Sequence, residues 1–286
     1  MVAEGQTNHL LIFGLGYSGR AIAKAAVVAG WQVSATVRSE TKAVPGVEQL
    51  PFSKAASAIA TATHILSTAA PDETGDPVLA RYHAALKAAP AKWLGYLSTT
   101  GVYGDADGAW VDEDTKPNPG SARTQRRVAA EHGWAALGKP LAIFRLAGIY
   151  GPGRSMLDDL RTGQARHVLK PGHLVGRIHR EDIAQAVLAA LSQSATGIFN
   201  LSDDEPATPS DVVQEAARLL GIAPPPPVPY EQIAKTMSPM ALSFWAENRK
   251  VASGKTKSCL GIAWRYPTYR QGLAAILAEE RADDIT

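Results

Sequence analysis

The chain has 286 residues, of which 45% are hydrophobic and 20% charged; its net charge of +2 excludes a general nucleic-acid binder. One cysteine, Cys259, excludes an internal disulfide, and we expect a reducing, cytoplasmic location. The first residues do not form a signal peptide, and no apolar run approaches the roughly 18 residues expected of a membrane span.

Short apolar runs alternate with longer alanine-rich stretches through the first half of the chain. The apolar runs predict buried strands over 9–13, 31–37, 64–67, 93–98 and 141–145, and a further short strand over 47–51 is an option. The stretches between them predict helices over 20–29, 76–89 and 121–137, the last capped by Asn118 or Ser121 with Pro119 in its first turn. Strands that alternate with helices imply an α/β protein with a doubly wound parallel sheet.

After Tyr150, glycine and proline interrupt a loop-rich region. A helix over 181–191 and a strand over 197–201 can return to the sheet, and further helices are predicted near 210–220 and 268–278. The sequence therefore predicts a Rossmann-like dinucleotide-binding domain over 1–150, to which 180–201 returns. A smaller C-terminal substrate-binding domain is expected from 151–179 and 202–286.

A glycine-rich segment, GLGYSG at 14–19, directly follows the first strand and opens a helix. In this context Gly14 permits the tight turn, Gly16 lets the backbone approach a pyrophosphate, and Gly19 lets the helix pack on the strand. The helix start around Tyr17 and Ser18 offers N–H groups and a dipole to the phosphates. Tyr17 itself either covers the phosphates or packs. The segment predicts a dinucleotide site.

The end of the second strand bears on which dinucleotide binds. NAD-binding proteins usually place an acid there, but this strand runs into Arg38 and Ser39, with no acid until Glu40. Because an arginine can pair with a 2′-phosphate, the sequence favours NADP(H) over NAD(H). A solvated surface arginine is the alternative interpretation.

Four motifs follow the glycine segment in order: LSTTGVYGD at 97–105, FRLAGIYGPGRS at 144–155, GRIHREDIAQAV at 176–187 and IFNLSDDEP at 198–206. This series resembles the extended short-chain dehydrogenase/reductase family of nucleotide-sugar epimerases and dehydratases, and the glycine spacing matches its atypical members. The resemblance covers nearly the whole chain. It implies a Rossmann domain, a smaller substrate domain and a homodimer through helices 76–89 and 121–137. It also implies further cofactor contacts at Thr68, Ala69, Ala70, Leu146 and Ile149.

The family works with a Ser or Thr, and with a Tyr and a Lys spaced Tyr-x-x-x-Lys on the helix after the fifth strand. Thr99 matches the hydroxyl residue; aligned on Glu131, the Tyr position falls on Arg123 and the Lys position on Arg127. Residues four apart share one helical face, so we expect both arginines to face the cofactor and occupy the catalytic positions.

An arginine changes the chemistry of these positions. A guanidinium has no usable proton at neutral pH, so Arg123 cannot be the general acid–base. It could instead neutralise an anionic substrate group or stabilise an oxyanion, while Arg127 could still hold the nicotinamide ribose. Thr99 either orients a substrate oxygen or caps the backbone at the strand end.

The segment from 154 to 180 carries six Lys or Arg residues against two acids, together with three histidines. It matches the region where family members hold a nucleotide-sugar diphosphate, so Arg154, Arg177 and His179 are candidate substrate-binding residues. A solvated basic loop is the alternative, and His179 could simply join loop to helix by a hydrogen bond. No metal site is expected, because the histidine and cysteine spacing fits none.

Two functions remain open at this level. The first is an NADP(H)-dependent oxidoreductase or epimerase-like enzyme acting on a small anionic or nucleotide-sugar-like substrate. The second is a non-catalytic NADP(H)-binding sensor or regulatory protein. The glycine segment supports both, the missing tyrosine favours the second, and the basic region favours a real ligand.

Overall fold

A seven-stranded parallel sheet forms the centre of the computed structural model, which describes residues 8–39 and 41–283. The strand order is β3-β2-β1-β4-β5-β7-β11. These strands are β1 (His9–Phe13), β2 (Gln32–Val37), β3 (Val47–Pro51), β4 (His64–Ser67), β5 (Trp93–Thr99), β7 (Leu141–Leu146) and β11 (Gly197–Leu201). This order is the doubly wound Rossmann arrangement, which confirms the predicted fold class, and the optional strand over 47–51 forms one edge.

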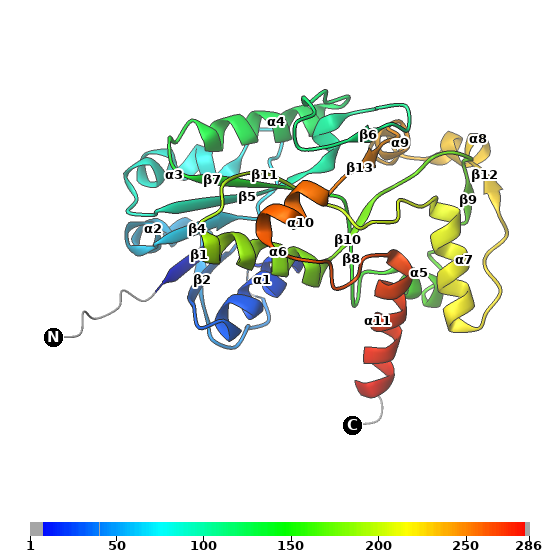
Figure 1. Cartoon of the computed structure of the whole chain (residues 1–286), viewed down its shortest axis with the longest axis horizontal. Coiled ribbons are helices and arrows are strands. Elements are labelled where there is room, and N and C mark those ends of the chain that lie inside the picture. Colours follow the sequence, from blue (N-terminus) through cyan, green and yellow to red (C-terminus); the bar gives the residue numbers. More distant parts are fainter. Residues whose placement is uncertain (1–7, 40, 284–286) are drawn as a thin grey trace.

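Helices cover both faces of the sheet (Figure 1). One face carries α1 (Tyr17–Val28), α6 (Arg180–Gln193) and α10 (Gly254–Leu260); the other carries α2 (Ala56–Thr61), α3 (Pro77–Ala88) and α4 (Ala122–Ala135). Alternate residues of β1 divide between the two layers, with Leu10 and Ile12 in one apolar cluster and Leu11 and Phe13 in the other. A strand buried on both faces reads as a continuous apolar run, which is why the sequence predicted it.

A smaller C-terminal region lies beside the sheet, at the right of Figure 1. Its apolar cluster joins α5 (Met156–Arg161), α7 (Pro209–Leu220) and α11 (Tyr269–Asp283). The remaining short strands form three pairs: β8 (Gly148–Tyr150) with β10 (Arg177–His179), β9 (Val168–Leu169) with β12 (Val228–Pro229), and β6 (Trp110–Val111) with β13 (Lys250–Val251). Two further short helices are α8 (Tyr230–Ile233) and α9 (Pro239–Trp245).

The starts of two helices that carry site residues differ from the prediction. Helix α1 begins at Tyr17 rather than at residue 20, because Gly16 serves as its N-cap and the glycine segment leads directly into the first turn. Helix α4 begins at Ala122, where Ser121 caps it by accepting a hydrogen bond from the N–H of Thr124 at 3.3 Å. Pro119 therefore precedes the cap and does not belong to the first turn.

Candidate functional site

A cavity of about 620 Å³ opens at the carboxyl ends of the central strands, where open α/β sheets bind their ligands. Twelve predicted site residues line it: Gly16, Tyr17, Ser18, Gly19, Thr68, Thr99, Arg123, Arg127, Leu146, Ile149, Arg154 and Arg177. Six others lie outside its lining: Gly14, Arg38, Ser39, Ala69, Ala70 and His179. The cavity continues past the Rossmann edge to residues 173–177 and 244–251 of the smaller region.

The three glycines of the segment meet different surroundings. Gly14 has a φ of 98°, and the carbonyl oxygen of this residue accepts a hydrogen bond from the hydroxyl of Thr68 at 2.8 Å. A Cβ on Gly19 would lie 2.2 Å from that same carbonyl oxygen, so helix and strand can pack this closely because Gly19 has no side chain. A Cβ on Gly16 would meet no described atom within 4 Å, which leaves its backbone open to a ligand.

Tyr17 joins the glycine segment to the turn after β8. Its hydroxyl donates to the carbonyl of Pro152 at 3.1 Å, and the guanidinium carbons of Arg154 and Arg180 lie 5.5 and 5.1 Å from its ring centre. Burial, opposed by Arg180, raises the pKa of the phenol. A tyrosine held in this way packs between loops while still lining the cavity beside the first turn of α1.

The residues expected near the adenosine ribose lie on the surface. Arg38 and Ser39 follow β2 and are exposed, and Arg38 makes no hydrogen bond to any residue of the described ranges. The neighbouring Glu40 lies outside the described residues. Arg38 and Arg126 help to lower the pKa of Asp72, although its hydrogen bond from Thr74 contributes most.

The two arginines that the sequence predicts at catalytic positions of α4 both line the cavity but are held differently. The Nη1 group of Arg127 donates to the carbonyl of Leu97 at 2.8 Å and to the hydroxyl of Tyr96 at 3.1 Å, which ties it to β5. Arg123 instead stacks its guanidinium 4.3 Å from the ring centre of Phe244. Burial lowers the pKa of Arg123, and its Nε is buried without a hydrogen-bond partner among the described residues.

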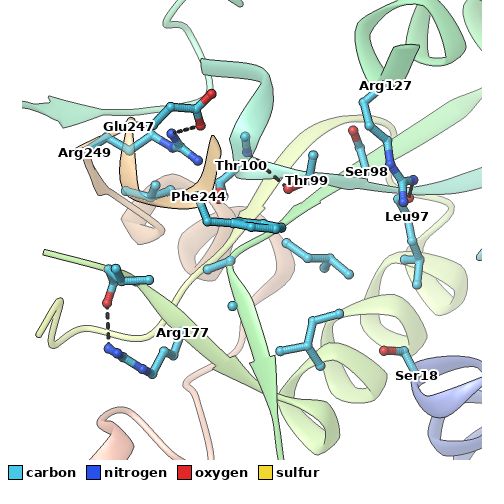
Figure 2. Close-up of a pocket in the computed structure, with 18 of the residues that line it drawn as sticks. Ser18, Leu97, Ser98, Thr99, Thr100, Arg127, Arg177, Phe244, Glu247 and Arg249 are labelled. Carbon is cyan, nitrogen blue, oxygen red and sulfur yellow. Dashed lines mark hydrogen bonds and ion pairs between the residues drawn. The ribbon is translucent and has the colours of Figure 1, made fainter. Parts of the chain in front are cut away.

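Thr99 ends β5 at the mouth of the cavity. Its hydroxyl oxygen accepts a hydrogen bond from the N–H of Gly101 at 3.1 Å and so caps the short 3-10 helix Thr100–Tyr103. An accepted bond leaves the hydroxyl proton free to donate, so the capping role and a role in orienting a substrate oxygen are compatible. Figure 2 shows Thr99 and Thr100 on one side of the Phe244 ring.

Glu131 fixes which face of α4 turns towards the sheet. Its carboxylate accepts from Ser98 at 2.6 Å and pairs with Arg145 at 2.7 Å, and all three side chains are buried. Arg127 and Arg123 lie four and eight residues before it on the same face. This buried anchor explains why both arginines reach the cavity from α4.

Arg177 reaches the cavity from β10 and is half-buried. Its Nη1 donates to the carbonyls of Val175 at 2.8 Å and Ala207 at 3.3 Å, and burial lowers its pKa. His179, two residues later, is 2% exposed and N-caps α6 by accepting from the N–H of Glu181. This placement is the loop-to-helix hydrogen bond that the sequence offered as the alternative to substrate binding.

The chain is similar to several known proteins, although no protein-family profile matches it. Among curated proteins it is 29% identical over 57% of its length to a Streptomyces 3-diazoavenalumate denitrifying reductase, covering 58% of that protein. It is 36% identical over 46% of its length to YeeZ from Escherichia coli, covering 47% of that protein. The chain thus spans about half the length of the curated relatives it matches.

Solved structures extend the likeness over the whole chain. A conserved Silicibacter pomeroyi protein of unknown function is 42% identical with a TM-score of 0.88, over 96% of this chain and 99% of that one. A candidate NAD-dependent epimerase/dehydratase from Methylobacillus flagellatus is 27% identical with a TM-score of 0.77, over the same shares of the two chains. The chain therefore has the NAD-dependent epimerase/dehydratase fold of the extended short-chain dehydrogenases/reductases, and it is a YeeZ-like homologue.

NAD(P) binding is typical of this family. Two further solved structures, each 19% identical to the chain, share its fold. The human epimerase family protein SDR39U1 with NADPH has a TM-score of 0.77 over 94% of this chain and 99% of that one. MoeE5 with UDP-glucuronic acid and NAD has a TM-score of 0.78 over 96% of this chain and 99% of that one. Within the described ranges, no helix has the length and apolar character to cross a bilayer, and no three His, Cys, Asp or Glu side chains gather as a metal site.

The sequence did not predict one wall of the cavity. Phe244, Trp245, Glu247 and Arg249 line it, from the end of α9 and the chain after it. Glu247 pairs with Arg249 at 2.7 Å (Figure 2). Arg249 also donates to the carbonyl of Gly104. The available signal was the run FWAENR, but a helix of seven residues is too short for periodicity to assign its faces.

We predict that His179→Asn flattens the pH dependence of stability. Burial, aided by Arg180 and Arg265, lowers the pKa of His179 from 6.5 to about 4. The unfolded chain therefore binds the proton more readily between these values, and stability falls as the pH falls from 6.5 towards 4. Asparagine keeps a capping acceptor but does not titrate.

The expected pH-dependent loss at this position is at most about 3 kcal/mol. Urea unfolding of both proteins at several pH values measures the difference between them. A difference that stays constant between pH 6.5 and 4 would show that His179 titrates normally in the folded protein.

Proposed function

We propose that this chain is an NADP(H)-dependent reductase acting on an anionic small molecule. The observation that carries the proposal is the charge of the cavity, whose described lining holds five arginines against one glutamate. The arginines are Arg123, Arg127, Arg154, Arg177 and Arg249, and the glutamate, Glu247, already pairs with Arg249. The same cavity begins at the glycine segment, so cofactor and substrate would share one space.

The described residues fit a dinucleotide. Gly16 faces open space, and the first turn of α1 offers N–H groups and no acid. Arg154 is exposed beside that turn, and Arg38 is exposed beyond the end of β2, where a 2′-phosphate would find a cation. When bound, the nicotinamide supplies or takes a hydride.

The side chains at the catalytic positions suit a reaction that needs no phenolic proton donor. Arg123 offers positive charge and donors where the family has tyrosine, and Thr99 offers one hydroxyl. A guanidinium stabilises negative charge that develops on the substrate but does not protonate it. A proton required by the product would therefore come from water, or the reaction would proceed by loss of a leaving group.

The name of one curated relative supports a reductase activity. This relative is named a denitrifying reductase, and its substrate, 3-diazoavenalumate, is named as an anion. The alternative is a non-catalytic NADP(H)-binding sensor. Its support is that Arg127 is tied to Leu97 and Tyr96 and that Arg123 is stacked on Phe244.

Cofactor preference is tested by Arg38→Ala. We expect NADPH affinity to fall at least about tenfold while NADH affinity changes little, because a charge-assisted hydrogen bond contributes roughly 1.5–3 kcal/mol. Calorimetric titration with each nucleotide measures both values, and Arg20→Ala, at a half-buried cation of α1 that donates to the hydroxyl of Thr41, is the control. Equal losses for the two nucleotides would remove Arg38 from 2′-phosphate recognition.

Turnover separates the two functions. The purified chain is mixed with NADPH and, in turn, 3-diazoavenalumate, UDP-glucose and UDP-glucuronic acid, while the absorbance of the reduced nicotinamide and the products are followed. NADPH oxidation supports the reductase, and sugar interconversion without net oxidation supports an epimerase. Tight NADPH binding with no reaction on the panel favours the sensor.

Three expectations stay proposals of the same kind. The first is the division into a dinucleotide-binding domain over 1–150 with 180–201 and a substrate domain from the remainder. The second is a homodimer through α3 and α4, which sedimentation would detect. The third is a cytoplasmic location, with which the exposed free thiol of Cys259 agrees.

A further inference from the structure

Phe244 is an apolar ring exposed inside a strongly basic cavity. The side chain of this residue, at the end of α9, is 56% exposed and lines the same space as Thr99 and Arg177. Figure 2 shows the ring edge-on near the centre of the pocket, with Thr99 and Thr100 on one side and Arg177 on the other. Such exposure of a large aromatic side chain within a cavity points to a ligand that covers it.

One face of this ring is already covered. The guanidinium carbon of Arg123 lies 4.3 Å from the ring centre, which is stacking distance. No other ring of the described residues packs against Phe244. The exposed area must therefore come from the opposite face and the edge, and that face is available to a ligand.

The helix that carries Phe244 is anchored through the next residue. The ring centre of Trp245 lies 5.1 Å from that of His173 and 5.3 Å from that of Tyr230. Its carbonyl also accepts a hydrogen bond from Lys170. These contacts hold α9 against the smaller region, so Phe244 forms a fixed wall of the cavity.

The charges around the ring are unbalanced. Glu247 is committed to Arg249, whereas Arg123 keeps a buried Nε without a partner among the described residues. The Nη1 of Arg177 donates hydrogen bonds to two backbone carbonyls, and this residue makes no ion pair within the described chain. A ring with a cation on one face is polarised, so its other face favours an electron-rich, negatively charged π system over a neutral saturated one.

We propose that Phe244, Arg123 and Arg177 form a subsite for a planar aromatic carboxylate. The ring of the ligand stacks on the free face of Phe244, and its carboxylate is neutralised by Arg177, with Arg123 polarising the stack from behind. This inference names the substrate class of the proposed reductase and rests on that function for its biological meaning. The binding of an aromatic carboxylate itself depends only on the side chains of Phe244, Arg123 and Arg177.

Three matched probes test the subsite by calorimetry on the full chain, with and without saturating NADP⁺. They are 2-naphthoate, its saturated analogue decahydro-2-naphthoate, and the neutral 2-naphthylmethanol. We expect 2-naphthoate to bind at least about fivefold more tightly than either, since the saturated acid loses the aromatic stacking and the alcohol loses the charge. Phe244→Leu should reduce the ratio between the two acids below about threefold, whereas Phe244→Tyr should keep it.

Trp110→Leu is the matched control, because Trp110 is equally exposed at 56% and lies under Lys250 but outside the cavity. Thermal unfolding and NADPH affinity of each variant report intact folding and an intact cofactor site. Absence of 2-naphthoate binding, equal affinity for the two acids, or an unchanged ratio in Phe244→Leu would each overturn the subsite. If NADPH does not bind while the preference for 2-naphthoate over its saturated analogue is retained, the proposed reductase is overturned and the subsite is not.

Discussion

Replacing Glu131 with alanine should lower the free energy of unfolding by about 3–5 kcal/mol. Glu131 and Arg145 form an ion pair at 2.7 Å with side-chain exposures of 5% and 2%, deep between α4 and the sheet. Removing the acid leaves Arg145 buried with its charge uncompensated, and also removes the acceptor of Ser98. The loss comes from the stranded cation more than from the attraction of the pair.

The double variant Glu131→Met with Arg145→Met separates these contributions. Removing both charges leaves no stranded ion, so the double variant should lose clearly less stability than Glu131→Ala. Urea unfolding followed by circular dichroism measures all three proteins. A loss below about 1 kcal/mol for Glu131→Ala would mean that water reaches Arg145 in the folded protein.

The elements of the Rossmann half could be predicted because burial on both faces leaves a direct trace in the sequence. Runs such as those of β1 and β4 are short, apolar and separated by helical stretches. The start of α1 was placed three residues late, because a glycine N-cap carries no side-chain signal of its own. Glu131 was informative because aligning the family's spacing on it predicted that Arg123 and Arg127 share one face of α4. The structure buries Glu131 itself against the sheet.

The far wall of the cavity could not be predicted, because it depends on contacts between distant parts of the chain. Phe244 meets Arg123 across more than a hundred residues, and Arg249 meets Gly104 across a similar span. Local patterns carry no information on such pairs. The same limit applies to His179, whose burial between Tyr150 and Tyr266 follows from tertiary packing rather than from the motif in which it stands.

On α4, the location of the two arginines and the groups that they contact are set by different parts of the structure. The cap at Ser121 and the burial of Glu131 turn one face of α4 towards the cavity, and Arg123 and Arg127 both line the cavity from this face. What each arginine contacts is decided elsewhere: by the backbone of β5 for Arg127 and by α9 for Arg123. The lining of the cavity around these arginines therefore depends on the C-terminal region as well as on the Rossmann edge.

Two alanine substitutions in the glycine segment should have separable effects. In Gly19→Ala the new Cβ would lie 2.2 Å from the carbonyl oxygen of Gly14, a backbone atom that cannot move aside. We expect a net loss of about 1–3 kcal/mol in stability, after a gain of up to about 1 kcal/mol from helix propensity. NADPH binding should weaken as well, because the turn that presents the N–H groups must shift.

Gly16→Ala should lower stability by no more than about 1 kcal/mol, because alanine is a poorer N-cap than glycine. Its Cβ meets no described atom within 4 Å, and the backbone φ of −80° suits alanine. The added methyl group stands where a pyrophosphate would approach, so NADPH affinity should fall at least about tenfold. Thermal unfolding and nucleotide titration of the two variants give the four values required. Normal NADPH affinity in Gly16→Ala would place the phosphates away from the glycine segment and remove the basis of the proposed reductase.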